Sequence, residues 1–291
     1  MATEAFVNAQ FELYRYPDGD QLKLREAVAD IYNLSEAQIV CGNGSEELIG
    51  LCTRSFVGSG DEVILTRNHF VMCPIYVRGQ RAEVILAEEA NDVIDVEQIL
   101  SAITDKTRMI IVANPNNPTG TYINETELGR LIEGIPDSVI LILDGAYAEY
   151  VTAADFDDGL GHVSDHENIV VTHTFSKIYG LAGLRVGWAC AQESVLEKVN
   201  KLRTPFNVNG PAMAAAVAAV RDQSFVEKVR NANRGELNWI LPAMRDLGFE
   251  VADSVANFYL VDTAPVEGAT TEGAVSYLES CGVTPRSGGI D

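Results

Sequence analysis

The sequence predicts an α/β fold with a mostly parallel sheet, followed by a smaller α+β region. Two observations lead to this prediction. Short runs such as "MIIVA" and "VILIL" are apolar throughout, as expected of strands that are buried on both faces of a sheet. These runs alternate with longer amphipathic stretches that are typical of the helices covering such a sheet.

The alternation of strands and helices begins at about residue 36. Each β-branched run predicts a strand, and each amphipathic stretch between two runs predicts a helix. The expected strands are residues 38–41, 62–66, 83–87, 108–113, 139–144, 168–172 and 184–191. The expected helices are residues 45–56, a stretch after residue 66, 96–103 and 125–134.

Past Arg203 the pattern changes, because "TPFNVNGP" is typical of a linker and long helical stretches follow it. Helices are expected at 212–220, 223–247 and 271–281, and strands at 258–261 and 283–285. We therefore expect an N-terminal arm (1–34), a large domain (35–208) and a small C-terminal domain (209–291).

Composition narrows the possible functions. The net charge of −21 argues against non-specific binding to nucleic acid or to an anionic membrane. No apolar run approaches the roughly 20 residues of a membrane-spanning helix, and no secretory signal is recognisable. The five cysteines form no CxxC pair and have no metal-ligand spacing, so reduced thiols and no metal site are expected. A cytoplasmic protein is expected.

In open α/β sheets, ligands bind at the carboxyl ends of the strands. After the first expected strand, "GNGSEE" opens a helix and suits either a phosphate on backbone N–H groups or a plain turn. It is no dinucleotide fingerprint, because Glu47 stands at the third glycine position, and no GK[ST] follows as in a P-loop.

Two further strand ends carry polar residues. "NPNNPTG" forms a rigid turn from which Asn117 projects, or it is a purely structural turn. Asp144 ends an apolar strand, where a carboxylate needs a cation or a donor unless it only caps a loop.

A lysine follows the next strand. Lys177 lies among hydroxyls and glycines in "TFSKIYGLAGLRVG", and Arg185 follows eight residues later. A buried lysine has a lowered pKa and becomes nucleophilic toward an aldehyde, while Arg185 and the hydroxyls suit a phosphate. A carboxylate such as Asp144 keeps a pyridine ring protonated. These groups together suit one cofactor, pyridoxal 5′-phosphate.

These motifs carry a resemblance. "NPNNPTG", the Asp-x-x-Tyr of "DGAY" and "TFSKIYGLAGLRVGW" together resemble the aspartate-aminotransferase superfamily, whose members are fold type I pyridoxal-phosphate enzymes. Within it, "YRYPDGDQLKLREAVAD" and "VCGNGSEELI" are most similar to the histidinol-phosphate aminotransferases. The resemblance extends from about Tyr14 to Gly289. It implies a seven-stranded-type sheet in the cofactor-binding large domain.

The resemblance also implies a role for each motif residue. Lys177 would be the Schiff-base lysine and general base, Asp144 would pair with the pyridine nitrogen, and Phe70 would stack on the ring or be an ordinary core aromatic. Tyr16 would reach the phosphate of the neighbouring subunit, which implies a homodimer. The ring hydroxyl would be bound by Asn117 and Tyr147, and the phosphate by Gly44, Ser45, Thr174, Ser176 and Arg185.

The chain departs from the family pattern in three places. Gly145 stands where the family usually has glutamate, directly after the pyridine-binding aspartate. The chain is expected to lack the family's N-terminal segment. The C-terminal strand with the carboxylate-binding arginine is also expected to be missing, because Arg286 matches a different arginine. The small domain is therefore expected to be incomplete.

The resemblance implies transamination of histidinol phosphate with glutamate and 2-oxoglutarate, in histidine biosynthesis. The substrates would be an amino donor and a 2-oxo acid or phosphorylated compound, without nucleic acid or membrane. Alternatives are a decarboxylase, a C–S or β-lyase or an aromatic aminotransferase on the same scaffold. A truncated cofactor-binding fragment with little activity is a further alternative.

Overall fold

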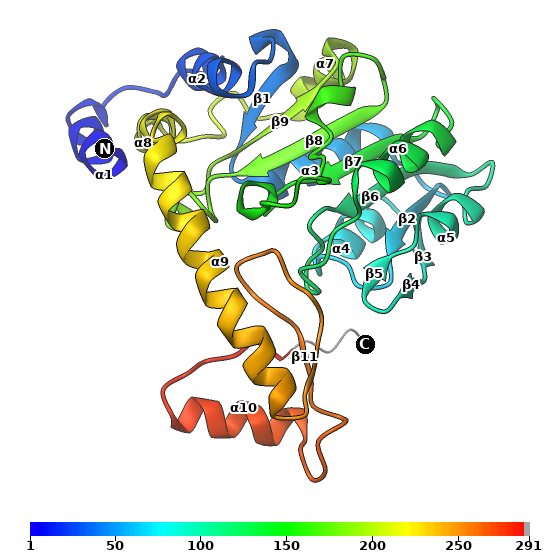
Figure 1. Ribbon diagram of the computed structural model, residues 1–291. Helices are drawn as coiled ribbons and strands as arrows, with labels where there is room; N and C mark the ends of the chain where they lie inside the picture. The colour runs from blue at the N-terminus through cyan, green and yellow to red at the C-terminus, as the bar shows by residue number, and fades with distance from the viewer. Residues whose placement is uncertain (288–291) are drawn as a thin grey trace.

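The computed structural model describes residues 1–287, and its centre is a seven-stranded sheet (Figure 1). The strand order is β1-β9-β8-β7-β6-β2-β3. Neighbours among β2, β3, β6, β7 and β8 pair in parallel, whereas β9 is antiparallel to both β1 and β8. The mostly parallel, seven-stranded sheet is confirmed. Its strands are β1 (Ile39–Gly42), β2 (Glu62–Thr66), β3 (Glu83–Ala87), β6 (Thr107–Ala113), β7 (Ile140–Asp144), β8 (Ile169–Thr174) and β9 (Gly187–Ala191).

Helices cover both faces of the sheet, which explains why the central strands are apolar on both sides. One hydrophobic cluster lies on each face. The first face is covered by α2 (Leu22–Tyr32), α5 (Val96–Ser101), α6 (Glu125–Gly134) and α8 (Gly210–Arg221). The second face is covered by α3 (Ser45–Phe56), α4 (Cys73–Gly79) and α7 (Glu193–Leu202).

Local sequence sets where several helices begin. The side chains of Asn124 and Asn209 accept hydrogen bonds from the first turns of α6 and α8, as N-cap residues do. The N-cap residue of α3 is Gly44, which has a φ of 87° and no side chain that could cap the helix. The first backbone N–H groups of α3 therefore have no side-chain acceptor and are available to donate hydrogen bonds to a bound group.

The C-terminal region leaves the sheet along the 24-residue helix α9 (Gln223–Asp246), which runs toward α10 (Thr271–Ser280) in Figure 1. Only Val226 and Leu241 of α9 are buried. Two short strands, β10 (Glu250–Val251) and β11 (Val261–Asp262), pair antiparallel beside it. Helix α1 (Ala2–Ala9), at the other end of the chain, packs against α8.

Three expectations about strands were wrong. Residues 283–285 form no strand, since Pro285 has no N–H to donate to a ladder. The strand expected at 258–261 begins only at Val261, because its partner β10 is two residues long. The strand expected at 184–191 begins at Gly187, because Arg185 adopts a left-handed backbone with a φ of 53°.

Smaller elements complete the described chain. A hairpin of β4 (Glu89–Ala90) and β5 (Val93–Ile94) was not expected from the sequence. Single-turn 3-10 helices occupy Gln10–Glu12, Glu36–Gln38, Ala148–Tyr150, Leu160–His162 and Ala182–Leu184. All five cysteines are free thiols, and only Cys281 is exposed. None of the helices in residues 1–287 is both long and apolar enough to cross a membrane. The end of "TPRSGGID", including Gly289, lies outside the described residues.

Candidate active site

The strand directions bring the polar segments to one edge of the sheet. Strands β6, β7 and β8 run in parallel, and β1 shares their direction because both β1 and β8 are antiparallel to β9. The carboxyl ends of these strands and the start of β9 therefore meet at one edge. The segments collected there are the "GNGS" turn, the Asn114–Gly120 turn, Asp144, Lys177 and Arg185.

Asp144 ends β7 with a buried side chain. Its Oδ1 accepts hydrogen bonds from Thr172 Oγ1 at 3.0 Å and from the Ala146 backbone N–H at 3.3 Å. Burial raises the pKa of Asp144 above its usual value, although these two donors and the nearby His173 and Lys177 oppose the shift. A carboxylate in this setting is stabilised by any cation placed against it.

Lys177 lies directly after β8, half-buried, with its Nζ 5.0 Å from the ring centroid of Tyr147. Tyr147 is buried and packs edge-on against Phe258, with ring centroids 4.9 Å apart. The ammonium therefore sits over an aromatic face, a placement that favours a cation or a planar group bound to the amine. The structure brings Lys177, Tyr147 and Asp144 to the same end of neighbouring strands.

Arg185 approaches the "GNGS" turn closely. Its Nη1 donates to Ser176 Oγ at 3.1 Å and to the Ala182 carbonyl at 3.3 Å, and its Nη2 lies 3.9 Å from Glu46 Oε2. A Cβ at Gly44 would lie 2.6 Å from Nη2, so only glycine leaves room for the guanidinium here. The left-handed backbone of Arg185 is uncommon outside glycine and is concentrated at functional sites.

The loop after β8 and the start of α3 bring further hydrogen-bonding groups close to Arg185. Thr174 Oγ1 accepts from the Ser176 N–H at 3.1 Å, which orders the loop beside the N-terminus of α3 at Ser45. Thr174 also pairs with Gly187 across the sheet, and a Cβ at Gly187 would lie 2.4 Å from Ser45 N. Guanidinium, hydroxyls and an uncapped helix N-terminus form the donor set that binds phosphate.

Phe70 and Asp144 line one small cavity of about 10 Å³, together with Thr66, His69, Cys73, Ile111, Ala113 and Asn116. Phe70, which the resemblance places on the cofactor ring, therefore lies near the Asp144 carboxylate. Asn117 is half-buried on the adjoining turn. Its neighbour Asn116 is fixed by hydrogen bonds from Nδ2 to the Asn68 carbonyl at 3.0 Å and to Glu89 Oε1 at 3.3 Å.

A loop from the C-terminal region, residues 254–258, touches two of these parts. The Val255 N–H donates to the Gly120 carbonyl at 2.9 Å, and a Cβ at Gly120 would lie 2.0 Å from Ser254 Oγ. Phe258 contacts Tyr147. Asn233 of α9 holds the same loop through a 3.0 Å hydrogen bond to the Ala256 carbonyl.

Tyr16 stands apart from this cluster. It is 83% exposed and stacks on Phe206 with a centroid distance of 4.8 Å. Phe11 and Tyr14 beside it are also exposed. The role expected for Tyr16 requires a second subunit, so it remains a prediction.

Three contributors were missed by reasoning from sequence. Thr172 supports Asp144, and Glu46 pairs with Arg185 and accepts the Tyr76 hydroxyl at 2.8 Å. Thr172 was detectable, because in a strand it shares a face with Thr174 two residues later. Glu46 and Tyr76 carried no signal, since their contact joins residues 30 positions apart.

A family model for aminotransferases of class I and II matches residues 2–285. The chain belongs to this family. It is 42% identical over 288 residues to histidinol-phosphate aminotransferase of Rhodospirillum centenum, covering 99% of this chain and 79% of that protein. The enzyme of the same name from Dinoroseobacter shibae is 44% identical over 268 residues, covering 92% of this chain and 74% of that protein.

Solved structures agree with this family placement. The crystal structure of histidinol-phosphate aminotransferase from Sinorhizobium meliloti, in complex with pyridoxal-5′-phosphate, matches with a TM-score of 0.92 and 27% identity. It covers 99% of this chain, which spans 78% of that one. Aspartate aminotransferase of Thermus thermophilus, at 24% identity and a TM-score of 0.86, shares the fold. The family's aminotransferase scaffold and mixed α/β fold are those expected from the motifs.

Proposed function

We propose that the chain is a pyridoxal-phosphate-dependent aminotransferase that transfers an amino group between histidinol phosphate and 2-oxoglutarate, in histidine biosynthesis. The identity of 42% to the Rhodospirillum centenum enzyme over nearly the whole chain supports the substrate assignment. The Sinorhizobium meliloti structure, solved with the cofactor, supports the cofactor assignment.

One observation of this structure carries the proposal. Lys177, a phosphate-type donor cluster at Arg185 and a buried carboxylate at Asp144 lie together at one edge of the sheet. These are the three groups that a pyridine aldehyde phosphate requires. Gly44 and Gly187 are consistent with this ligand. A side chain at Gly44 would clash with the Arg185 guanidinium, and one at Gly187 would clash with the Ser45 backbone N–H.

The proposed roles follow from these positions. Lys177 Nζ would hold the aldehyde group of the cofactor, and its free amine would move the proton at the reacting carbon of the substrate. Asp144 holds the proton on the ring nitrogen, while Asn117 and Tyr147 donate to the ring oxygen and Phe70 packs on the ring. Gly44, Ser45, Thr174, Ser176 and Arg185 hold the phosphate. The bound cofactor supplies an electron sink for the carbanion.

The remaining assignments concern the rest of the chain. We propose a cytoplasmic homodimer in which Tyr16 of one subunit completes the phosphate site of the other, since this tyrosine is exposed in the single chain. We also propose three parts with boundaries near residues 34 and 208. No described arginine is assigned to the substrate carboxylate.

The test is an absorbance titration. The purified chain with pyridoxal phosphate is expected to show the visible band of a lysine-bound cofactor, and L-glutamate is expected to convert it to the ultraviolet band of pyridoxamine phosphate. Oxidation of added histidinol phosphate to its ketone in the presence of 2-oxoglutarate tests the substrate. A wild-type chain that binds the cofactor but reacts with no amino donor would refute the aminotransferase assignment.

Lys177→Ala is the decisive variant. It is expected to lose the borohydride-reducible link and about 10²–10⁴-fold in turnover, because the proton-transfer group is removed. Lys198→Ala is the matched control, since that lysine lies over Phe56, on the second face of the sheet. Retention of the reducible link in Lys177→Ala would refute the lysine assignment.

A further inference from the structure

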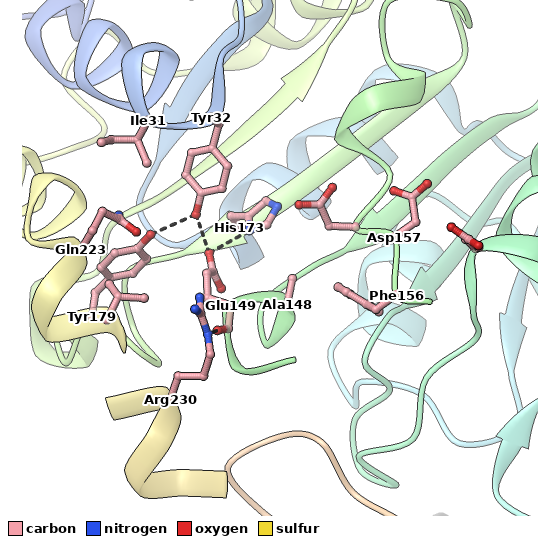
Figure 2. Close-up of a pocket in the computed structure, with 13 residues that line it drawn as sticks. Ile31, Tyr32, Ala148, Glu149, Phe156, Asp157, His173, Tyr179, Gln223 and Arg230 are labelled. Atoms are coloured by element: carbon pink, nitrogen blue, oxygen red, sulfur yellow. Dashed lines mark hydrogen bonds and ion pairs between the residues drawn. The ribbon is translucent and has the colours of Figure 1, made fainter. Parts of the chain in front are cut away.

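Figure 2 shows a largely buried polar cluster formed by Tyr32, Glu149, His173 and Tyr179. His173 follows Thr172 in β8, so its side chain points to the opposite face. Its Nδ1 is 2.9 Å from Glu149 Oε1, which also accepts the hydroxyl of Tyr32 at 2.9 Å. Tyr32 in turn is 2.9 Å from the hydroxyl of Tyr179.

The imidazole of His173 is held in one orientation. It stacks on Trp188 with a centroid distance of 4.6 Å and an interplanar angle of 7°. A Cβ at Gly145 would lie 3.2 Å from both Cε1 and Nε2 of the ring. The edge of the ring opposite Glu149 therefore faces Gly145, the residue that follows Asp144. A side chain at position 145 would therefore require the His173 ring to shift by a few tenths of an ångström, which glycine at this position avoids.

The charges around His173 favour its cationic form. Burial disfavours the imidazolium, but the Glu149 carboxylate in contact, with Asp158 and Asp144 nearby, raises the pKa of His173 above its usual value. A cavity of about 450 Å³ adjoins the cluster, and Glu125, Asp157 and Arg230 also line it. Arg230 Nε donates a hydrogen bond to the backbone carbonyl of Glu149 and not to its carboxylate.

We propose that His173, held against Glu149, is a positioning residue that holds the Asp144 turn in place and, as the imidazolium, keeps Asp144 ionised for the ring nitrogen. The proposal rests on the cofactor-binding function above. The ring lies so close to Gly145 that an added Cβ would be 3.2 Å from it, and the Gly145 N–H donates to the Thr172 carbonyl at 2.8 Å. Thr172 therefore holds the Asp144 carboxylate on one face of the sheet, and His173 lies against the following residue, Gly145, on the other face.

A cation near Asp144 is useful because Asp144 is buried. Burial raises the pKa of the Asp144 carboxyl, and a neutral Asp144 would leave the ring nitrogen without its counter-charge. A fixed cation on the adjacent strand opposes that protonation. It does so before any substrate arrives, because Glu149 and Trp188 fix its position in the protein itself.

The experiment uses holoenzyme without substrate. The pH midpoint at which bound pyridoxal phosphate loses its visible, protonated form is measured for wild type, His173→Phe and Glu149→Gln. Loss of the cation makes a proton at the Lys177 link easier to hold, so both variants are expected to raise the midpoint by about one unit. Cofactor affinity is expected to fall several-fold in both.

Glu149→Gln separates charge from structure. Glutamine still accepts hydrogen bonds from Tyr32 and His173 but no longer stabilises the imidazolium, so a purely structural role predicts an unchanged midpoint. His162→Phe is the matched control, because that histidine also pairs with a carboxylate, Asp157 at 2.9 Å, yet is half-buried away from Gly145. It is expected to titrate like wild type.

The outcomes are distinguishable from those of the proposed function. Wild-type midpoints in Glu149→Gln, or in a folded His173→Phe, would overturn the inference while leaving the aminotransferase assignment intact. A raised midpoint in both variants supports the inference whether or not glutamate reacts. A wild-type chain without any cofactor band would overturn both.

Discussion

The sheet around Lys177 and the region after α8 are packed very differently. Helix α3, which presents the phosphate-type donors, buries seven of its twelve residues, whereas α9 buries only Val226 and Leu241 among 24. Helix α10 buries none. Few buried contacts mean low local stability, so the region around the cofactor-binding residues is expected to be more stable than the region after α8.

The largest effect expected from this contrast is on core stability. Phe175→Ala, next to the lysine loop and fully buried, is expected to cost about 3–5 kcal/mol because it leaves a cavity in the sheet core. Trp239→Ala, on α9 and 59% exposed, is expected to change stability by about 0.5 kcal/mol or less. Urea unfolding of the two variants measures both. Equal losses would mean that the two regions are packed alike.

A smaller effect is expected where β9 passes under the α3 turn. Gly187→Ala places a Cβ 2.4 Å from Ser45 N and 2.8 Å from the His173 carbonyl, so it should cost about 1–3 kcal/mol and weaken cofactor binding. Gly210→Ala, at the start of α8 with nothing within 4 Å, is expected to be neutral or stabilising. Calorimetric midpoints with and without cofactor test the pair. Unchanged cofactor affinity in Gly187→Ala would contradict the tight approach.

The smallest effect is expected at the loop of residues 254–258, which connects the C-terminal region to the sheet. Ser254 Oγ accepts from the Ala256 N–H at 3.1 Å and donates to the Phe258 carbonyl. Ser254→Ala is expected to cost about 1 kcal/mol and to lower cofactor affinity slightly, since the loop supports Gly120 and Tyr147. Ser280→Ala, exposed at the end of α10, is the control. Equal changes in the two variants would argue against a supporting role for the loop.

Much of the sheet was predictable because its signals are local. The expected bounds of β2, β3 and α6 equal the observed ones, since each is an apolar or amphipathic run with clear ends. Arg185 shows where this fails. Its segment looks like a continuous strand, but contacts with Ser176 and Gly44 hold it in a left-handed backbone that the run of apolar residues does not reveal.

The candidate site was predictable in its motifs and less so in its supports. Strand order alone brings Lys177, Asp144 and the "GNGS" turn together, so the rule about carboxyl ends of strands sufficed. The partners of these residues depend on packing between distant segments. His173 carried no clear signal, because its role depends on Glu149 and on the missing side chain at Gly145, and neither relation is visible as spacing.

The loop at residues 254–258 makes the site mechanically dependent on α9. It is tied to α9 through Asn233 and bears on both Gly120 and Tyr147. Any swing of the long helix is therefore transmitted to the two segments that would grip the ring oxygen. The end of α9 at Asp246 lies about 20 Å along the helix from Asn233, given the 1.5 Å rise per residue. A change in the position of α9 would therefore reach this loop, and through it Gly120 and Tyr147, without any contact to Lys177.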